Sequence, residues 1–185
     1  SVCIGMLFSK EITKIDQALK EGSTLNSIVG GSKISTKIKV LENLLEKSQK
    51  VLVGGGIANT FLKAMGYEIG KSLVEVNMLD RAKKMLKTGK IVLPENVYIA
   101  ESPEMGEVTL VPVEDVPKDK MILDIEFNFT EMNKFSSEMT IWNGPLGMFE
   151  QDKFSNGTKQ LISYLEYTSS KVIAGGGETI FAIKK

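Results

Sequence analysis

The chain has 185 residues, enough for one domain with a sizeable core, and 42% of them are hydrophobic, as is typical of a soluble globular chain. Its 23 basic and 23 acidic residues give a formal net charge of zero, so no global charge attracts it to nucleic acid or to an anionic membrane. The sequence contains no histidine, which excludes a Ser-His-Asp triad and any histidine-containing zinc site within this chain, and its single cysteine excludes an internal disulfide.

The sequence shows neither a membrane-spanning segment nor a signal peptide. No apolar run is long enough to span a membrane, and the N-terminus lacks the basic start and the cleavage pattern of a signal peptide. The lone Cys3 fits a reducing compartment. These features predict a cytoplasmic protein that binds neither nucleic acid nor membranes. Any anion site must then be built locally, from lysines, carboxylates and backbone N–H groups.

Helical spacing and short apolar runs alternate along the chain. In chain order the patterns predict a helix at residues 10–21, a strand at 27–29, a helix at 34–46, a strand at 50–53, helices at 57–65 and 79–87, strands at 90–93, 97–100 and 108–113, a polar helical stretch at 127–139, a strand at 140–142, a helix at 157–167, a strand at 171–174 and a helix that begins near Glu178.

Strands that alternate with helices predict parallel βαβ units. The strands are short and continuously apolar, which is typical of a sheet buried on both sides. We therefore expect an α/β fold, namely an open, mostly parallel sheet with helices on both faces in a Rossmann-like, three-layer arrangement. Residues 1–185 are expected to form one domain.

Three strand ends share one feature, since each runs into glycine and then into a helix. The segments are "SIVGGSKIST" (27–36), "KVLVGGGIANTF" (50–61) and "KVIAGGGETIF" (171–181). In an open parallel sheet, ligands bind beyond the carboxyl ends of the strands, where helix N-termini present free N–H groups. Glycine lets backbone approach a phosphate or a flat ring. The repeated pattern predicts a nucleotide-sized site, although glycines that only make tight turns would give the same letters.

The standard nucleotide fingerprints do not fit. "GYEIGKS" (66–72) is one residue short of a P-loop and follows a helix, whereas a P-loop follows a strand. "GGGIAN" and "GGGETI" lack the third glycine of the dinucleotide motif. A dinucleotide-dependent dehydrogenase therefore fits poorly.

Two further segments carry candidate ligand groups. Lys33 and Lys37 are four residues apart at the start of a predicted helix, a spacing that places both ammonium groups on one edge; solvated lysines would look the same. In "TIWNGPLGMFE", Asn143 and Glu150 are of types that bind a ribose or a phosphate, and the intervening Pro145 and Leu146 could flank a flat ring. A strand-ending turn with an aromatic plug is the structural alternative.

In this order, "VGGSKISTKIKVLENLLEK", "VLVGGGIANTFLKAMGYEIGKSLVE", "IVLPENV", "TIWNGPLGMFE" and "VIAGGGETIFAIKK" resemble phosphoglycerate kinases over nearly the whole chain. The resemblance implies the C-terminal, nucleotide-binding lobe of a two-lobed glycolytic kinase, which moves phosphate reversibly between 1,3-bisphosphoglycerate and ADP with Mg²⁺. It fades at residues 101–138, where Glu126 and Phe127 replace the Gly-Pro of the family.

The resemblance also implies site residues. Lys33 and Gly177 would be catalytic, and Glu178, where the family generally has Asp, would serve the metal. The glycines at 54–56 would lie against the adenine, and those at 175–177 would open a helix onto the phosphates. The positions implied to contact ADP or ATP are Gly30, Gly31, Lys33, Lys37, Gly54, Gly55, Gly56, Asn143, Pro145, Glu150, Gly175, Gly176, Gly177, Glu178 and Thr179.

Two parts of the family's proteins are absent from the sequence. One is the lobe that binds 3-phosphoglycerate or 1,3-bisphosphoglycerate, and the other is the final strand. We therefore expect a fragment of a longer protein, monomeric and inactive as a kinase on its own, whose sheet lacks its last strand. The alternative is a nucleotide-binding module or a degenerate homologue without transfer activity, which the departures at Glu178 and at Glu126–Phe127 would explain.

Overall fold

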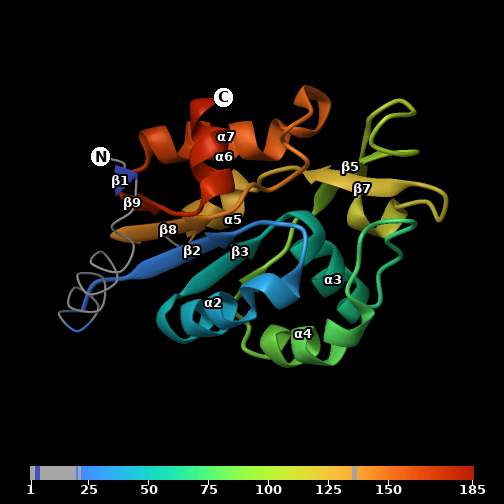
Figure 1. Ribbon diagram of the computed structural model, residues 1–185. Coiled ribbons are helices and arrows are strands. Elements are labelled where there is room, and N and C mark those ends of the chain that lie inside the picture. Colours follow the sequence, from blue (N-terminus) through green and yellow to red (C-terminus); the bar gives the residue numbers. More distant parts are fainter. Residues whose placement is uncertain (1–2, 5–19, 21, 135–136) are drawn as a thin grey trace.

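The computed structural model describes residues 3–4, 20, 22–134 and 137–185 (Figure 1). Its main sheet has six strands, all parallel, in the order β1-β9-β8-β2-β3-β4. The strands are β1 (Cys3–Ile4), β2 (Leu25–Val29), β3 (Lys50–Val53), β4 (Ile91–Val92), β8 (Met139–Asn143) and β9 (Lys171–Ala174). The predicted α/β fold with an open, mostly parallel sheet is confirmed.

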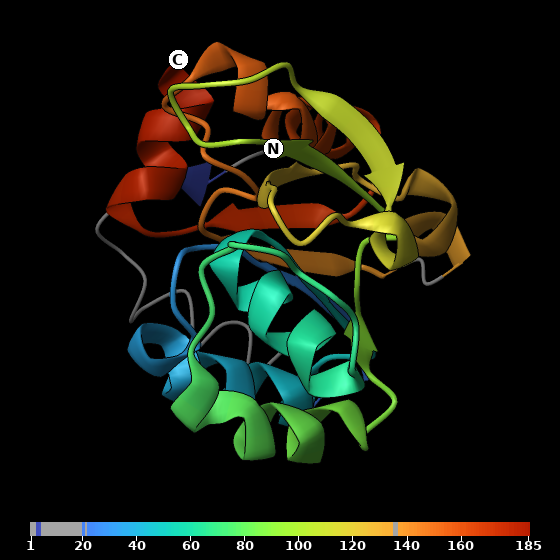
Figure 2. The ribbon, with the colours of Figure 1, turned by 90° about the vertical axis from the view of Figure 1, so that its right-hand side faces the viewer.

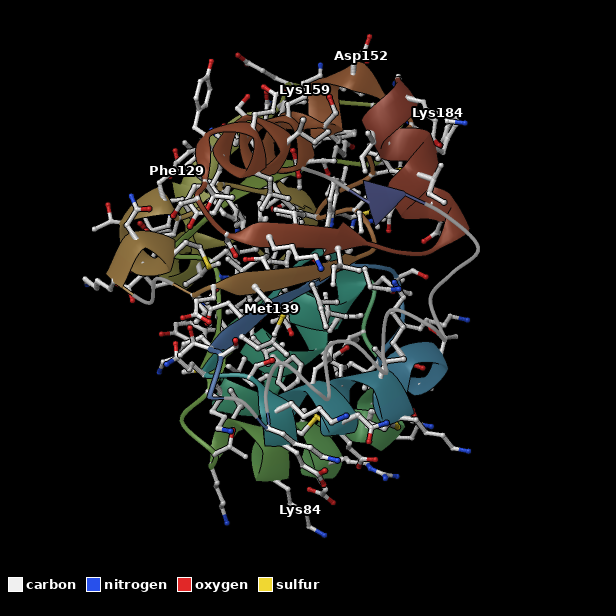
Figure 3. The ribbon with its side chains drawn as sticks, turned by 90° about the vertical axis from the view of Figure 1, so that its left-hand side faces the viewer. Lys84, Phe129, Met139, Asp152, Lys159 and Lys184 are labelled. Atoms are coloured by element: carbon white, nitrogen blue, oxygen red, sulfur yellow. The ribbon has the colours of Figure 1, made fainter. Side chains whose placement is uncertain are left out.

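Helices cover both faces of this sheet. In Figure 1, α2 (Ile34–Lys47), α3 (Gly55–Met65) and α4 (Leu79–Leu86) lie below it, while α6 (Asn156–Tyr167) and α7 (Gly177–Lys184) lie above. Figure 3 shows the same layers from the β1 side, with Asp152 and Lys159 above the sheet and Lys84 below. Among the described helices, none is both long enough and apolar enough to cross a membrane.

The core is divided by the sheet, because successive strand residues point to opposite faces. Val51 and Val53 belong to the cluster that packs on α2, α3 and α4, and Leu52 between them belongs to the cluster that packs on α6. Burial of both faces explains why these strands are continuously apolar.

A second, antiparallel sheet lies on the side seen in Figure 2, with the order β6-β5-β7. It consists of β5 (Asn96–Ala100), β6 (Thr109–Pro112) and β7 (Met121–Ile125). The strands predicted at 97–100 and 108–113 belong to this sheet. Strand β7 was not predicted, although its burial alternates along the sequence "MILDI".

The predicted elements otherwise agree closely with the structure. The bounds of β3 and β9 match the prediction at both ends, and α2, α3, α4 and α6 each differ by one or two residues. The helix predicted at 127–139 is wrong in extent. Of the described residues in this range, only those of α5 (Phe129–Lys134) are helical, and Met139 already belongs to β8. The helix predicted at 10–21 falls, apart from Lys20, outside the described residues.

The substituted segment at Glu126–Phe127 is well packed. Glu126 Oε2 accepts a hydrogen bond of 2.7 Å from Asn96 Nδ2, which ties the end of β7 to the start of β5. Phe127 is buried, and its ring packs edge-on against Phe129 with centroids 4.9 Å apart. The two replacements therefore build local contacts of their own.

Candidate functional site

The glycine-ended strands converge on one edge of the sheet, as the sequence predicts. The end of β2 is joined to β8 because Gly30 N donates to Asn143 O at 3.0 Å. Gly54 N donates to Val29 O at 3.0 Å, and Gly175 N donates to Trp142 O at 2.9 Å. Four neighbouring strands thus deliver their C-terminal loops to the same place, where open α/β sheets bind ligands.

Several of these glycines are required by close packing of backbone. A Cβ added to Gly30 would lie 1.8 Å from Pro145 O, and one added to Gly56 would lie 2.2 Å from Ser32 O. Neither position has room for a side chain. For these two positions the tight-turn explanation holds, whether or not a ligand also contacts them.

Gly177 differs from them. It is exposed at the first position of α7, and a Cβ built there meets no atom within 4 Å. The fold therefore does not need glycine at this position. The first N–H groups of a helix lack intrahelical acceptors and carry the positive end of the dipole, so this exposed end of α7 suits an anion.

Lys37 has a role that the sequence did not predict. Its half-buried ammonium donates to Gly30 O at 2.7 Å and to Asn143 O at 3.2 Å, so it holds the ends of β2 and β8 together. Burial lowers the pKa of Lys37, and the nearby Glu178 carboxylate opposes that shift. An ammonium has three N–H groups, so one remains for a ligand.

Lys33 is exposed and lies at the N-cap of α2, in extended conformation with φ of −138°. It precedes the helix, so Lys33 and Lys37 do not share a helical edge in the way their spacing predicted. The carboxylate of Glu75 sits at the same helix start, where Oε2 accepts from Ser35 N at 2.9 Å.

Thr179 and Asn143 fasten the loops after β8 and β9 to each other. Thr179 Oγ1 donates to Gly175 O at 2.8 Å and accepts from Gly144 N at 2.7 Å. Asn143 Nδ2 donates to Gly175 O at 3.0 Å. Both side chains were predicted to contact a ligand. In the structure their hydrogen bonds also stabilise the turn.

A cavity of about 450 Å³ lies beside these strand ends, within the size range of small-molecule sites. The predicted site residues that line it are Gly31, Gly55, Gly56, Pro145, Glu150 and Glu178. Leu146 was expected to flank a ring, which is wrong, because it is fully buried against Gly54. The sequence missed Asn59, Leu73 and the lining that comes from β7. Recognition of "MILDI" as a strand would have been the signal for that part.

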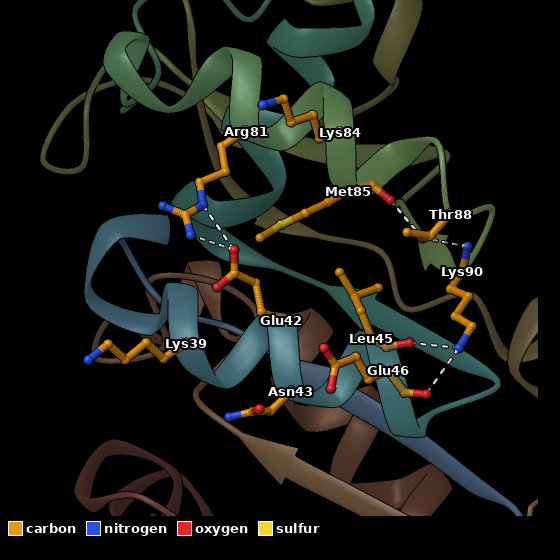
Figure 4. A pocket seen from close by; sticks show the side chains of 10 residues that line it. All are labelled: Lys39, Glu42, Asn43, Leu45, Glu46, Arg81, Lys84, Met85, Thr88 and Lys90. Atoms are coloured by element: carbon orange, nitrogen blue, oxygen red, sulfur yellow. Dashed lines mark hydrogen bonds and ion pairs between the residues drawn. The ribbon is translucent and has the colours of Figure 1, made fainter.

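A larger hollow of about 930 Å³ lies between α2 and α4 (Figure 4). None of the predicted site residues lines it. Some of its polar groups are paired with one another. Arg81 binds Glu42 at 2.6 Å, and Lys90 Nζ donates to Leu45 O at 2.6 Å. The smaller cavity at the strand ends is therefore the better candidate.

The metal prediction rests on Glu178. Its carboxylate is exposed at the rim of the cavity. In the part of the chain that the structure describes, no group of three or more His, Cys, Asp or Glu side chains is arranged to hold a metal ion. Mg²⁺ is usually held by one or two carboxylates together with substrate phosphates, so a single carboxylate fits Mg²⁺ that arrives with a nucleotide.

The fold and this edge define a class of protein, an α/β domain with a ligand crevice at the carboxyl ends of parallel strands. The family model for phosphoglycerate kinase matches residues 1–185. Phosphoglycerate kinases from Francisella philomiragia and Desulfovibrio desulfuricans are 44% and 43% identical over 99% of this chain. The chain spans about half the length of these relatives, 49% and 50%.

Solved structures agree with this result. The phosphoglycerate kinase from Coxiella burnetii superposes with a TM-score of 0.82 at 37% identity, over 94% of this chain and 48% of that one. The enzyme from Pyrococcus horikoshii gives 0.76 at 25% identity, over 97% and 48%. The chain belongs to the phosphoglycerate kinase family, as its motifs predicted.

Proposed function

We propose that this chain is the nucleotide-binding part of a phosphoglycerate kinase, and that it holds ADP or ATP with Mg²⁺ at the ends of β2, β3, β8 and β9. The observation that carries the proposal is a cavity of about 450 Å³ directly beside the open start of α7. The phosphoryl group would pass between this nucleotide and a phosphoglycerate bound outside this chain.

The protein's part in such a transfer is positioning and charge stabilisation. The exposed N–H groups of α7 would receive the nucleotide phosphates. Lys33 would bring its ammonium to the moving phosphoryl group, and Lys37 would keep the strand ends fixed while offering its third N–H. Bound Mg²⁺ would supply positive charge to the phosphate oxygens. Glu178 would hold it, with phosphates completing the coordination.

Gly177→Ala tests the phosphate site directly. The methyl group would stand at the open start of α7, so we expect ADP to bind about tenfold more weakly in calorimetric titrations, while adenosine binds unchanged. The free energy of unfolding should stay equal or rise by about 0.5–1 kcal/mol, because alanine is the better helix residue. Unchanged ADP affinity would contradict the proposed phosphate position.

The two lysines supply a matched comparison. Lys33→Ala should weaken ADP binding at low salt, whereas Lys39→Ala, which removes another exposed lysine on α2, should not. In the same titrations, Glu178→Gln should raise the Mg²⁺ concentration needed for half-maximal ADP affinity.

The 185-residue chain alone should show no turnover in a coupled kinase assay, since it would not align donor with acceptor. Turnover by the chain alone would refute that expectation.

A further inference from the structure

Helix α7 and the loop after β8, residues 144–151, together form one wall of the candidate cavity. The loop contributes four lining residues, namely Pro145, Gly147, Met148 and Glu150. Glu178 lines the cavity from α7. Thr179 Oγ1 accepts from Gly144 N at 2.7 Å, so the start of α7 is tied to the start of the loop. The shape of this wall then depends on what holds the other end of the loop.

Lys185, directly after α7, holds that other end. Its ammonium donates to Phe149 O at 3.1 Å and to Glu150 O at 2.9 Å, and it lies 3.0 Å from Asp152 Oδ1. An ammonium has three N–H groups, so these three acceptors use all of them. The backbone N–H of Lys185 still donates to Phe181 O at 3.1 Å, and the ring of Phe181 packs edge-on against Phe149. The end of α7 is thus bound to residues 149–152.

The two carbonyls that Lys185 binds lie on either side of one Cα atom, that of Glu150. Each carbonyl belongs to a planar peptide group, and only the φ and ψ of Glu150 separate the two groups. A donor that binds both carbonyls therefore fixes the backbone conformation of Glu150 and the direction of its Cα–Cβ bond. The side chains of Lys185 and Asp152 are 36% and 79% exposed, so their ion pair adds little to the free energy of unfolding.

Glu150 has a side chain whose direction matters for a ligand. Its exposed carboxylate lines the cavity and makes no hydrogen bond or ion pair among the described residues. A carboxylate accepts hydrogen bonds and donates none, so it suits the hydroxyl groups of a ribose. A glutamate without a partner in the protein keeps its rotamer freedom, which leaves the backbone as the means of aiming it.

We infer that Lys185 is a positioning residue of the nucleotide site. It binds the carbonyls on either side of the Glu150 Cα and thereby directs the Glu150 carboxylate into the cavity, towards the ribose hydroxyls of ADP or ATP. Lys185 itself does not line the cavity. This inference rests on the proposed nucleotide function and adds to it a residue that acts through another.

The test compares ADP with 2′,3′-dideoxy-ADP, which has the same base and phosphates but lacks both ribose hydroxyls. In calorimetric titrations the parent chain should bind ADP about tenfold more tightly than the analogue, and Glu150→Ala should reduce that ratio to about one. Lys185→Met keeps the apolar stem and removes the donors. It should reduce the ratio to about two and leave the affinity for the analogue nearly unchanged.

Three matched variants separate positioning from charge. Lys184→Met removes the neighbouring exposed ammonium (Figure 3) and should leave the ratio unchanged. Asp152→Asn removes the ion pair and keeps both carbonyl acceptors, so it should also leave the ratio unchanged. Lys185→Arg keeps donors for the carbonyls and should retain most of the preference for ADP. Urea denaturation should show at most a small loss of stability for Lys185→Met.

The possible failures are distinguishable. If Glu150→Ala lowers the ratio and Lys185→Met does not, Lys185 does not position Glu150, and the proposed function stands. The inference is equally wrong if Glu150→Ala leaves the ratio unchanged, or if Lys184→Met lowers it as much as Lys185→Met does. If neither compound binds the parent chain at millimolar concentration, the nucleotide function and the inference both fail.

Discussion

Asp124 couples the stability of this protein to pH. The side chain is 1% exposed on β7, with Oδ2 hydrogen-bonded to Gly157 N and with Oδ1 buried without a partner among the described residues. Burial raises the pKa of Asp124 to about 7, because the backbone hydrogen bonds at Gly157, Ile125 and Asn156 and the charge of Lys159 only partly offset desolvation.

The direction in which pH changes the free energy of unfolding follows from proton binding. The ordinary pKa of this carboxyl is 3.8, so at intermediate pH the folded protein holds a proton that the unfolded chain has released. The free energy of unfolding therefore falls as the pH rises from about 4 to about 7. The difference between 3.8 and about 7 corresponds to about 4 kcal/mol at 1.36 kcal/mol per pKa unit.

Asp124→Asn should abolish this contribution. The amide keeps an acceptor for Gly157 N and carries no charge at any pH. Between pH 4 and pH 9, urea unfolding should therefore show that the free energy of unfolding of the variant rises steadily relative to that of the parent, by up to about 4 kcal/mol. Above pH 7 the difference should level off.

The surface variant Asp152→Asn is the matched control. The Lys185 ammonium lowers the pKa of Asp152, so its small contribution is present near neutral pH and is lost as the pH falls, with the opposite sign. If Asp124→Asn and the parent show parallel curves over the whole range, the buried carboxyl is not the titrating group and the reasoning is wrong.

Three further substitutions test the packing of the strand ends and the start of α2 by urea denaturation. Gly30→Ala should destabilise the chain by about 3 kcal/mol, because the new methyl would collide with Pro145 O, and a wild-type midpoint would refute that. Thr179→Val removes two hydrogen bonds and should cost about 2 kcal/mol at constant m-value; no loss would mean the loops hold without them. Burial alone would raise the pKa of Glu75. The hydrogen bonds that its carboxylate accepts from Ser35 outweigh this effect, so the pKa of Glu75 is lowered. Glu75→Gln should therefore reduce stability slightly near neutral pH and flatten its decline below about pH 4.5; an unchanged acid limb would argue against this cap.

The sequence predicted the fold class and the convergence of the glycine-ended strands because both depend on local patterns. Apolar runs that end in glycine define β3 and β9 correctly, and their shared polarity brings their ends to one edge. Strand β7 was missed because Asp124 interrupts its apolar run, and only the structure shows that this carboxyl caps α6. Pairing with β5 is likewise a long-range contact that no local pattern reports.

Side-chain roles at the strand ends were harder to predict. Lys37 was expected to face phosphate, and the same letters are equally compatible with an ammonium that binds two carbonyls. Which of these occurs depends on the distance between β2 and β8, set by residues about a hundred positions apart. Asn59 carried no signal at all, because a buried amide in a helix is evident only when its surroundings are known.

The glycines of this edge fall into two groups with different consequences. Gly30 and Gly56 are fixed by backbone packed against them, so the part of the crevice near α3 cannot easily change shape. Gly176, Gly177 and Glu178 are exposed, and Lys33 faces solvent at the start of α2. A nucleotide with its base in the rigid part would therefore carry its phosphates towards the open part. Transfer of a phosphoryl group to an acceptor held outside this chain would require that arrangement, because the reacting phosphate must remain accessible while the base is anchored.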